Sequence, residues 1–268
     1  MRTFVVAVTC LLFAAASASA AGVFTDDFEN YTGYTANNGN GWFTATNEPN
    51  YGNYSPLYTW GGERDPGQVV AAGGPHQSNV PSGKDNSQGM ANFDGGTPHG
   101  SSMALPGGPA GPGDKVIIQA DVNAANGGYG YLFIGDAALA GGAGSTDYLA
   151  GAIIMPNGNL AATTNGPEPK GPVDWSVGYV PVKLEVTVGS DGNVELAQAF
   201  ADEGSGWALK GTAGAAGQFQ ATHFAFSVPK FGTFDNLSVT VVPEPTTLSM
   251  LGMSLLGLAL AGRRRKNG

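Results

Sequence analysis

The feature that most constrains the fold is a strict alternation of side chains between residues 180 and 188. Val180, Val182, Leu184, Val186 and Val188 are apolar, and the residues between them are proline, lysine, glutamate and threonine. Successive side chains of a strand point to opposite faces, so this pattern predicts a strand with one face in a core and the other in solvent. The Gly-Ser-Asp-Gly turn that follows predicts a hairpin with a second strand at 193–200.

Further strand signals are spread over the chain. No segment between the two tails shows a long helical period, and the chain contains 43 glycines while only 12% of its residues are charged. Such a composition favours short strands joined by turns. The sequence therefore predicts an all-β fold, a two-sheet antiparallel jelly-roll sandwich. The other expected strands are 23–29, 115–122, 129–135, 149–155, 222–228 and 234–242.

The stretch from residue 30 to 114 differs from the rest. It contains Asn-Gly turns, two Gly-Gly-Pro runs and almost no aliphatic periodicity. An irregular stretch of this length is uncommon inside a compact domain unless it is functional or disordered. We therefore expect this region to be rich in loops.

The N-terminus has the three parts of a secretory signal peptide. Met1-Arg2 is positively charged, residues 3–16 are apolar, and Ala18-Ser19-Ala20 has the small-residue pattern of a cleavage site. We expect signal peptidase to cut after Ala20. Cys10, the only cysteine, then leaves with the signal, so the mature chain is expected to have no disulfide and no thiol chemistry.

The C-terminus combines a proline-rich motif, an uncharged segment and a basic cluster. Residues 246–262 carry no charge, and as a helix they reach about 25 Å, the low end of a bilayer core. The basic residues after them favour a cytoplasmic end for this predicted transmembrane helix. The prolines of Val-Pro-Glu-Pro keep the chain before it extended. A plain C-terminal anchor is the simplest interpretation.

This arrangement resembles the PEP-CTERM sorting signal of Gram-negative bacteria, over residues 242–266. The resemblance implies recognition by an exosortase, a membrane-embedded cysteine protease that cuts near the motif and sends the protein to the cell surface or extracellular matrix. The expected domains are a signal peptide at 1–20, a β-sandwich at 21–242 and the sorting signal at 243–268. The sorting residues are Pro243, Glu244, Pro245, Arg263, Arg264 and Arg265.

Removing both tails leaves an acidic chain. Seven basic and 20 acidic residues remain, so the net charge of the mature part is near −13. Nucleic-acid binding needs a basic surface that displaces phosphate counterions, and this charge argues against it. Acidic surfaces suit divalent cations and neutral glycans.

The body weakly resembles the concanavalin-like or laminin-G-like jelly roll of secreted proteins. The similarity rests on the opening Asp-Asp-Phe-Glu at 26–29, the hairpin 180–200 ending near Trp207, and the closing Phe-Asp-Asn-Leu-Ser-Val at 234–239. A galactose-binding-like jelly roll fits almost as well. In jelly rolls the first and last strands often lie side by side, which implies that acidic residues of the two segments meet.

These acidic residues form a candidate calcium site, because hard cations bind several carboxylate and carbonyl oxygens. Calcium is the only cofactor that we consider, and solvated turn residues are the alternative interpretation. A second candidate site is aromatic, since sugar rings stack on aromatic side chains, although the same rings could simply pack loops. The calcium candidates are Asp26, Asp27, Glu29, Asp235 and Asn236. The glycan candidates are Trp42, Tyr51, Tyr54, Tyr58 and Trp60.

Hydrolysis is the third possibility. A glycosidase needs two opposed carboxyl groups, and the pairs Glu63/Asp65 and Asp202/Glu203 are the candidates. The chain has no Gly-x-Ser-x-Gly elbow and only three histidines, His76, His99 and His223. We therefore predict no enzymatic activity. We expect an exported, structural or adhesive surface protein, with calcium-dependent binding of extracellular polysaccharide as the alternative.

Overall fold

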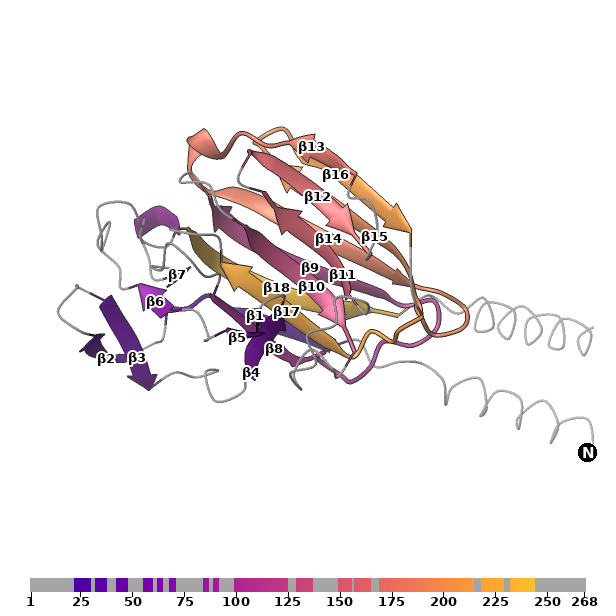
Figure 1. Ribbon diagram of the computed structural model, residues 1–268, viewed down its shortest axis with the longest axis horizontal. Coiled ribbons are helices and arrows are strands. Elements are labelled where there is room, and N and C mark those ends of the chain that lie inside the picture. The colour runs from indigo at the N-terminus through magenta and orange to yellow at the C-terminus, as the bar shows by residue number, and fades with distance from the viewer. Residues whose placement is uncertain are drawn as a thin grey trace, which may run out of the picture.

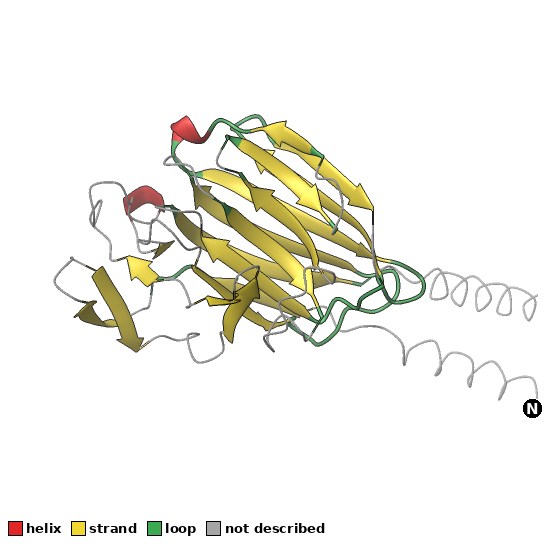
Figure 2. Cartoon of the chain, in the orientation of Figure 1, coloured by secondary structure: helices red, strands yellow, loops and turns green. Residues whose placement is uncertain are grey.

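A computed structural model describes most of the chain between residues 22 and 243. The described residues are 22–29, 32–37, 42–47, 55–59, 62–64, 68–70, 84–86, 89–91, 99–124, 129–136, 149–155, 157–164, 169–214, 218–228 and 232–243. They form two antiparallel sheets that stack face to face (Figure 1). The two helical elements among them are single turns, η2 (Lys84–Asn86) and η4 (Trp175–Val177) (Figure 2). The predicted all-β antiparallel sandwich is confirmed.

The first sheet, here called the β14 sheet, has the strand order β16-β15-β14-β9-β18-β7-β6, and β1 also pairs with β18. Its long central strands are those with the clearest alternation in the sequence. Its strands are β1 (Gly22–Asp26), β6 (Gln68–Val70), β7 (Gly89–Ala91), β9 (Lys115–Asn123), β14 (Val180–Val188), β15 (Val194–Asp202), β16 (Trp207–Gly214) and β18 (Thr233–Val242).

The second sheet, here called the β10 sheet, has the order β13-β12-β11-β10-β17-β8-β4-β5. A separate pair of strands, β2 (Thr32–Asn37) and β3 (Trp42–Asn47), forms a hairpin. The strands of the β10 sheet are β4 (Ser55–Thr59), β5 (Gly62–Arg64), β8 (His99–Ala104), β10 (Gly130–Gly135), β11 (Leu149–Ile154), β12 (Asn159–Thr163), β13 (Lys170–Pro172) and β17 (His223–Val228).

One core lies between the sheets. The five alternating apolar residues of β14 are all buried in it, while Pro181, Lys183 and Glu185 lie on the outer face. Each buried valine or leucine contributes on the order of 1.5–3 kcal/mol to stability. In the β10 sheet every residue of β10 is buried, because its outward side chains Tyr131 and Phe133 belong to a second apolar cluster. The predicted alternation therefore holds for one sheet and not for the other.

Residues 30–114, which we expected to be rich in loops, also contain short strands. This region supplies seven strands, β2 to β8. All seven are only three to six residues long, and some of them pair with distant segments: Ser102 of β8 pairs with Ala225 of β17. Strands this short show too little alternation to be recognised locally.

The sandwich has two ends, which we define by the direction of β18. At the near end, where β18 finishes, Val242 lies opposite Lys115, and the turn 189–193 and the segments 105–114 and 218–222 close the core. At the far end, where β18 begins, lie η2, η4 and the turn 203–206.

Candidate functional site

Two carboxylates face each other at the far end of the β14 sheet. Asp121 of β9 lies directly opposite Asp235 of β18 in the register. Asp121 lies between the core residues Ala120 and Val122, so alternation directs its carboxylate to the outer face, and its register partner Asp235 shares that face. Between Asp235 and Ser238 the register shifts, and Asn236 occupies the resulting bulge with φ 50°. Asparagine tolerates this left-handed conformation better than most residues.

Protein donors hold this pair of like charges. The Lys84 ammonium lies 3.0 Å from Asp121 Oδ2, and the Lys84 backbone N–H donates to Asp235 Oδ2 at 2.8 Å. The Asn236 side-chain amide also donates to Asp121 Oδ2, at 2.9 Å. Lys84 of η2 thus contacts β9 through Asp121 and β18 through Asp235. Both carboxylates are buried, and this contact joins η2 to the far end of the sheet.

A tyrosine next to this cluster is electrostatically perturbed. Burial raises the pKa of the Tyr179 hydroxyl well above its usual value, and the negative charges of Asp235 and Asp121 raise it further. A hydrogen bond with Thr233 opposes the shift. The phenol therefore stays neutral at ordinary pH. We refer to Lys84, Asp121, Tyr179, Asp235 and Asn236 as the far-end cluster.

The structure separates the predicted calcium ligands. β1 does pair with β18, but Asp26 lies opposite Leu237, a core residue, and therefore faces inward. Asp26 Oδ1 accepts the Phe28 N–H at 3.0 Å in a turn where Phe28 has φ 57°, which is a structural role typical of aspartate. Asp235 points to the opposite face of the sheet.

The remaining calcium candidates do not join the two faces. Asp27 and Glu29 are exposed, and the Asp27 carboxylate accepts the Glu29 N–H at 3.2 Å. Within the described ranges, no group of three or more His, Cys, Asp or Glu side chains is arranged to hold a metal ion. The five-residue grouping is therefore corrected to two separate sets, and calcium binding itself stays a prediction.

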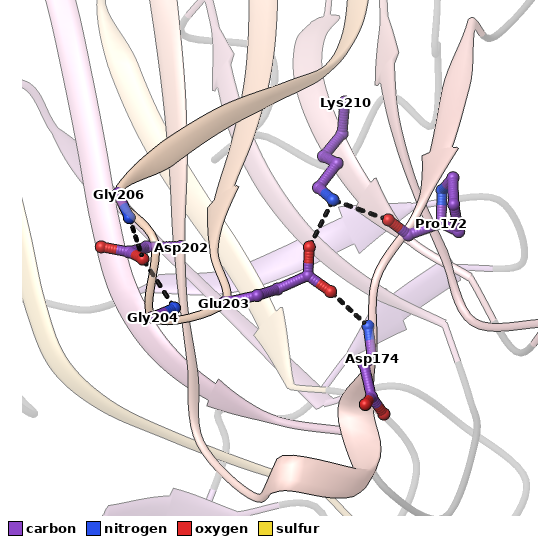
Figure 3. A network of polar contacts seen from close by, with 7 residues as sticks. All are labelled: Pro172, Asp174, Asp202, Glu203, Gly204, Gly206 and Lys210. Carbon is purple, nitrogen blue, oxygen red and sulfur yellow. Dashed lines mark hydrogen bonds and ion pairs between the residues drawn. The ribbon is translucent and has the colours of Figure 1, made fainter.

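A second polar network crosses the far end (Figure 3). The Glu203 carboxylate accepts from the Lys210 ammonium and from the Asp174 N–H, the latter at 2.8 Å. Lys210 also donates to the Pro172 carbonyl at 2.8 Å. The Lys210 hydrogen bond is the main cause that lowers the pKa of Glu203, and the Asp174 N–H adds to it. This network joins the β15–β16 turn to the segment that leads into β14.

The neighbouring carboxylate of the predicted hydrolytic pair is also engaged. Asp202 Oδ1 accepts the Gly204 N–H at 2.8 Å and the Gly206 N–H at 2.9 Å (Figure 3). Both glycines have positive φ, 94° and 95°, which explains why glycine occurs here. Asp202 and Glu203 thus shape a turn and make no opposed pair across a cleft. The other pair falls on Glu63, in β5 with an undescribed side chain, and on Asp65, outside the described residues.

The three histidines considered for hydrolysis are not brought into a described catalytic arrangement. The His223 Nδ1 lies 2.8 Å from the Thr222 hydroxyl, and burial lowers the pKa of its imidazole. His99 is the first residue of β8 and its side chain is not described, and His76 lies outside the described residues.

An aromatic patch that the sequence analysis missed lies on the outer face of the β14 sheet. Lys183 sits 4.3 Å from the ring centroid of Phe200 and 4.8 Å from that of Trp207. The same ammonium is 2.6 Å from a Glu185 carboxylate oxygen. Trp207 and Leu209 are 41% and 52% exposed. Two features of the sequence could have indicated this patch. They are the alternation along 194–200, which places Phe200 on the outer face, and the position of Trp207 just after the turn. Phe200, Trp207 and Leu209 form what we call the outer patch.

The aromatic residues predicted for glycan binding lie in a less defined part of the chain. Trp42 opens β3, and Tyr58 lies in β4, opposite Glu63 of β5. The side chains of these strands are not described. Tyr51, Tyr54 and Trp60 lie outside the described residues. Their role in glycan binding stays a prediction.

The end of β18 leads directly into the tail. Val241 pairs with Gly22 of β1, Val242 pairs with Lys115 of β9, and Pro243 is the first residue after the strand. The other predicted sorting residues, Glu244, Pro245 and Arg263 to Arg265, lie outside the described residues, as does the predicted helix 246–262. Among the described residues, no helix is long and apolar enough to cross a bilayer.

Known proteins resemble the tail and the body separately. Residues 241–266 match the PEP-CTERM protein-sorting motif. No curated protein matches the chain. Similar solved structures include lectin II from Ulex europaeus, at 11% identity and TM-score 0.38 over 67% of this chain and 98% of the lectin. Galectin LEC-6 of Caenorhabditis elegans has 11% identity and TM-score 0.34, over 56% of this chain and 94% of the galectin.

A third similar structure is the VIP36 exoplasmic/lumenal domain bound to Ca²⁺ and Man3GlcNAc, at 11% identity and TM-score 0.35 over 59% of this chain and 79% of that domain. At this level of similarity the sugar or ion bound by a neighbour carries no argument for this chain. The described residues thus form an antiparallel β-sandwich, and residues 241–266, which begin within its last strand, match a PEP-CTERM sorting motif.

Proposed function

We propose that this protein is an exported, non-catalytic surface or matrix protein that an exosortase-type protease sorts through its C-terminal motif. The proposal rests on the position of the motif: Pro243 is the first residue beyond the last strand, and all strands of the sandwich precede it. A cut at or after the motif therefore leaves the complete sandwich. Signal peptidase is the second processing partner, acting after Ala20.

The test is processing in a Gram-negative host that contains an exosortase. The triple change Pro243→Ala, Glu244→Ala and Pro245→Ala should leave the chain unprocessed and in the membrane fraction. The unaltered chain should be shortened by about 25 residues and recovered from the surface or medium. A control truncated after Val242 should be exported without membrane retention. Processing of the triple variant at the wild-type rate would overturn the proposal.

A second candidate function is binding of a neutral polysaccharide through the outer patch. The observation that favours it is the exposure of Trp207 beside Leu209, with the Trp207 ring held against Lys183. A ring fixed in this way loses little conformational entropy when a sugar stacks on it. The acidic charge of the mature chain favours neutral over anionic glycans. Such binding would give the domain an adhesive role in an extracellular polymer.

Affinity electrophoresis in gels containing neutral polysaccharides tests this function. Trp207→Ala should weaken the retardation at least tenfold, and Val177→Ala, which shortens an exposed apolar side chain elsewhere, should not change it. Repeating the gels with EDTA tests the calcium dependence predicted for the acidic residues, and Trp42→Ala tests the aromatic region near the N-terminus. Retardation by no neutral glycan, or equal retardation of wild type and Trp207→Ala, would exclude the patch.

A further inference from the structure

We propose that, while the sorting tail is attached, the sandwich stands end-on on the membrane with its near end against the lipid headgroups. The far-end cluster and the turn 203–206 then point away from the bilayer. This inference rests on the tail acting as a membrane segment, as in the proposed function. It adds an orientation and a membrane-facing surface that sorting alone does not require.

The connection between the last strand and the predicted membrane segment is short. β18 ends at Val242, and the predicted membrane helix begins at residue 246. Three residues extend at most about 10 Å. The prolines at 243 and 245 restrict the backbone further. The near end is therefore held within roughly 10 Å of the bilayer surface, a distance about equal to the diameter of a helix.

The N-terminal strand of the sandwich begins at the same end. Gly22 pairs with Val241, so the first described residue lies beside the last residues of β18. Cleavage by signal peptidase after Ala20 would occur at this same end. Both membrane-linked segments thus join the sandwich at one edge of the near end, and neither has to cross the domain to reach the bilayer.

Charged side chains are distributed unevenly between the two ends of the sandwich. The near-end segments 105–113 and 218–222 contain no charged side chain, and Asp114 is buried, where its carboxylate accepts the Gly111 N–H at 2.7 Å. The exposed charges described at this end are Lys115, Asp191 and Glu195. The far end carries the far-end cluster and the Glu203 network. An acidic domain approaches anionic headgroups with least repulsion through its least charged surface. Among the described segments, the near end carries fewer charged side chains than the far end.

The structure also provides a matched pair of reporter positions. Ser190 and Ser205 are exposed and lie in the turns at opposite ends of β15. Nine strand residues separate the two turns by about 30 Å. Because Cys10 is the only cysteine, a chain with Cys10→Ala gives a background without thiols.

The experiment uses the full chain with Cys10→Ala and either Ser190→Cys or Ser205→Cys, labelled with a bimane. Each is reconstituted into phosphatidylcholine–phosphatidylglycerol vesicles that contain nitroxide-headgroup lipid. We expect quenching at position 190 to exceed that at 205 at least threefold. Equal quenching, or stronger quenching at 205, would overturn the proposed orientation. Chains truncated after Val242 should show no quenching at either position.

A variant with a longer linker tests whether the short connection after Val242 sets the orientation of the domain. Inserting 20 glycine and serine residues between Val242 and Pro243 should make the two positions equal, because a flexible chain of that length lets the domain turn. If quenching at position 190 still exceeded that at 205 in this variant, the short connection would not be what sets the orientation. The failure of sorting can be distinguished from the failure of the orientation. A chain that is not processed but still shows stronger quenching at 190 argues against the proposed function alone. A chain that is processed normally but shows equal quenching argues against the orientation alone.

Discussion

The two ends of the sandwich are closed by different interactions. At the near end, main-chain hydrogen bonds join the loops: Gly113 donates to the Val188 carbonyl at 3.1 Å, and Val194 donates to the Phe219 carbonyl at 2.9 Å. At the far end, charged side chains of Lys84, Asp121 and Glu203 join the strands. Main-chain bonds do not titrate, whereas ion pairs depend on pH and salt. Stability of the far end should therefore respond to solution conditions more than that of the near end.

The largest effect is expected at the far end. Asp235 is 1% exposed and accepts the N–H groups of Lys84 and Asn236, so Asp235→Ala removes the acceptor of two part-buried hydrogen bonds. We expect the free energy of unfolding to fall by about 2–3 kcal/mol, measured by urea denaturation. The exposed Asp27, which accepts one N–H, is the control: Asp27→Ala should cost at most about 0.5 kcal/mol. Equal losses would mean that the cluster does not close this end.

The next prediction concerns the near end. A Cβ on Gly22 would lie 1.9 Å from the Pro106 carbonyl oxygen, so Gly22→Val should separate β1 from the loop beneath it. We expect a loss of about 1–3 kcal/mol by thermal unfolding, with the same loss at pH 5 and pH 8. Gly214→Ala is the control, because a Cβ there meets no atom within 4 Å. A loss that varied strongly with pH would contradict the comparison between the ends.

Tyr179 should make the far end sensitive to alkali. Its pKa is raised in the folded state, so its contribution is fully present below the unfolded pKa of about 10 and is lost as the pH rises toward the folded value. Between pH 10 and 11 the loss approaches about 1.4 kcal/mol. Tyr179→Phe should remove this loss, measured as the difference in unfolding free energy between wild type and variant across that range. Parallel curves would show that the tyrosine does not titrate with folding.

The smallest effect is expected for Glu203. Its pKa is lowered in the folded state, so its contribution is present above the unfolded pKa of about 4.3 and is lost as the pH falls below it. The group is partly exposed, and the ion pair with Lys210 should contribute only about 0.5 kcal/mol. A double-mutant cycle of Glu203→Gln and Lys210→Met measures it. The coupling should decrease in 1 M salt; a coupling unaffected by salt would argue against an ion pair.

Prediction from the sequence was most accurate where alternation was long and local. The strands around 115–122, 180–188 and 193–200 were found because nine-residue strands carry several periods of the pattern. The strands β2 to β8, β12, β13 and β16 were not predicted. Two of them, β8 and β7, pair with β17 and β18, which lie about 120–140 residues away, and a local pattern does not reveal such pairing.

The candidate sites show the same limit. The pairing of β1 with β18 was predicted. The register, however, directs the Asp26 side chain toward the core and the Asp235 side chain to the outer face. A shift of one residue reverses the face of every side chain, so proximity of two strands does not establish a shared site. Lys84 and Tyr179 join the far-end cluster from distant parts of the chain, and no motif marks either residue.

The sequence by itself determined the sorting motif, the acidic charge and the all-β class, because these depend on composition and on local patterns. The tertiary structure decided which carboxylates meet, where the outer patch lies, and that the tail leaves from the end opposite the charged cluster. These properties depend on strand register and on the pairing of distant segments. Register is set by the packing of the whole sandwich, and no local stretch of residues encodes it.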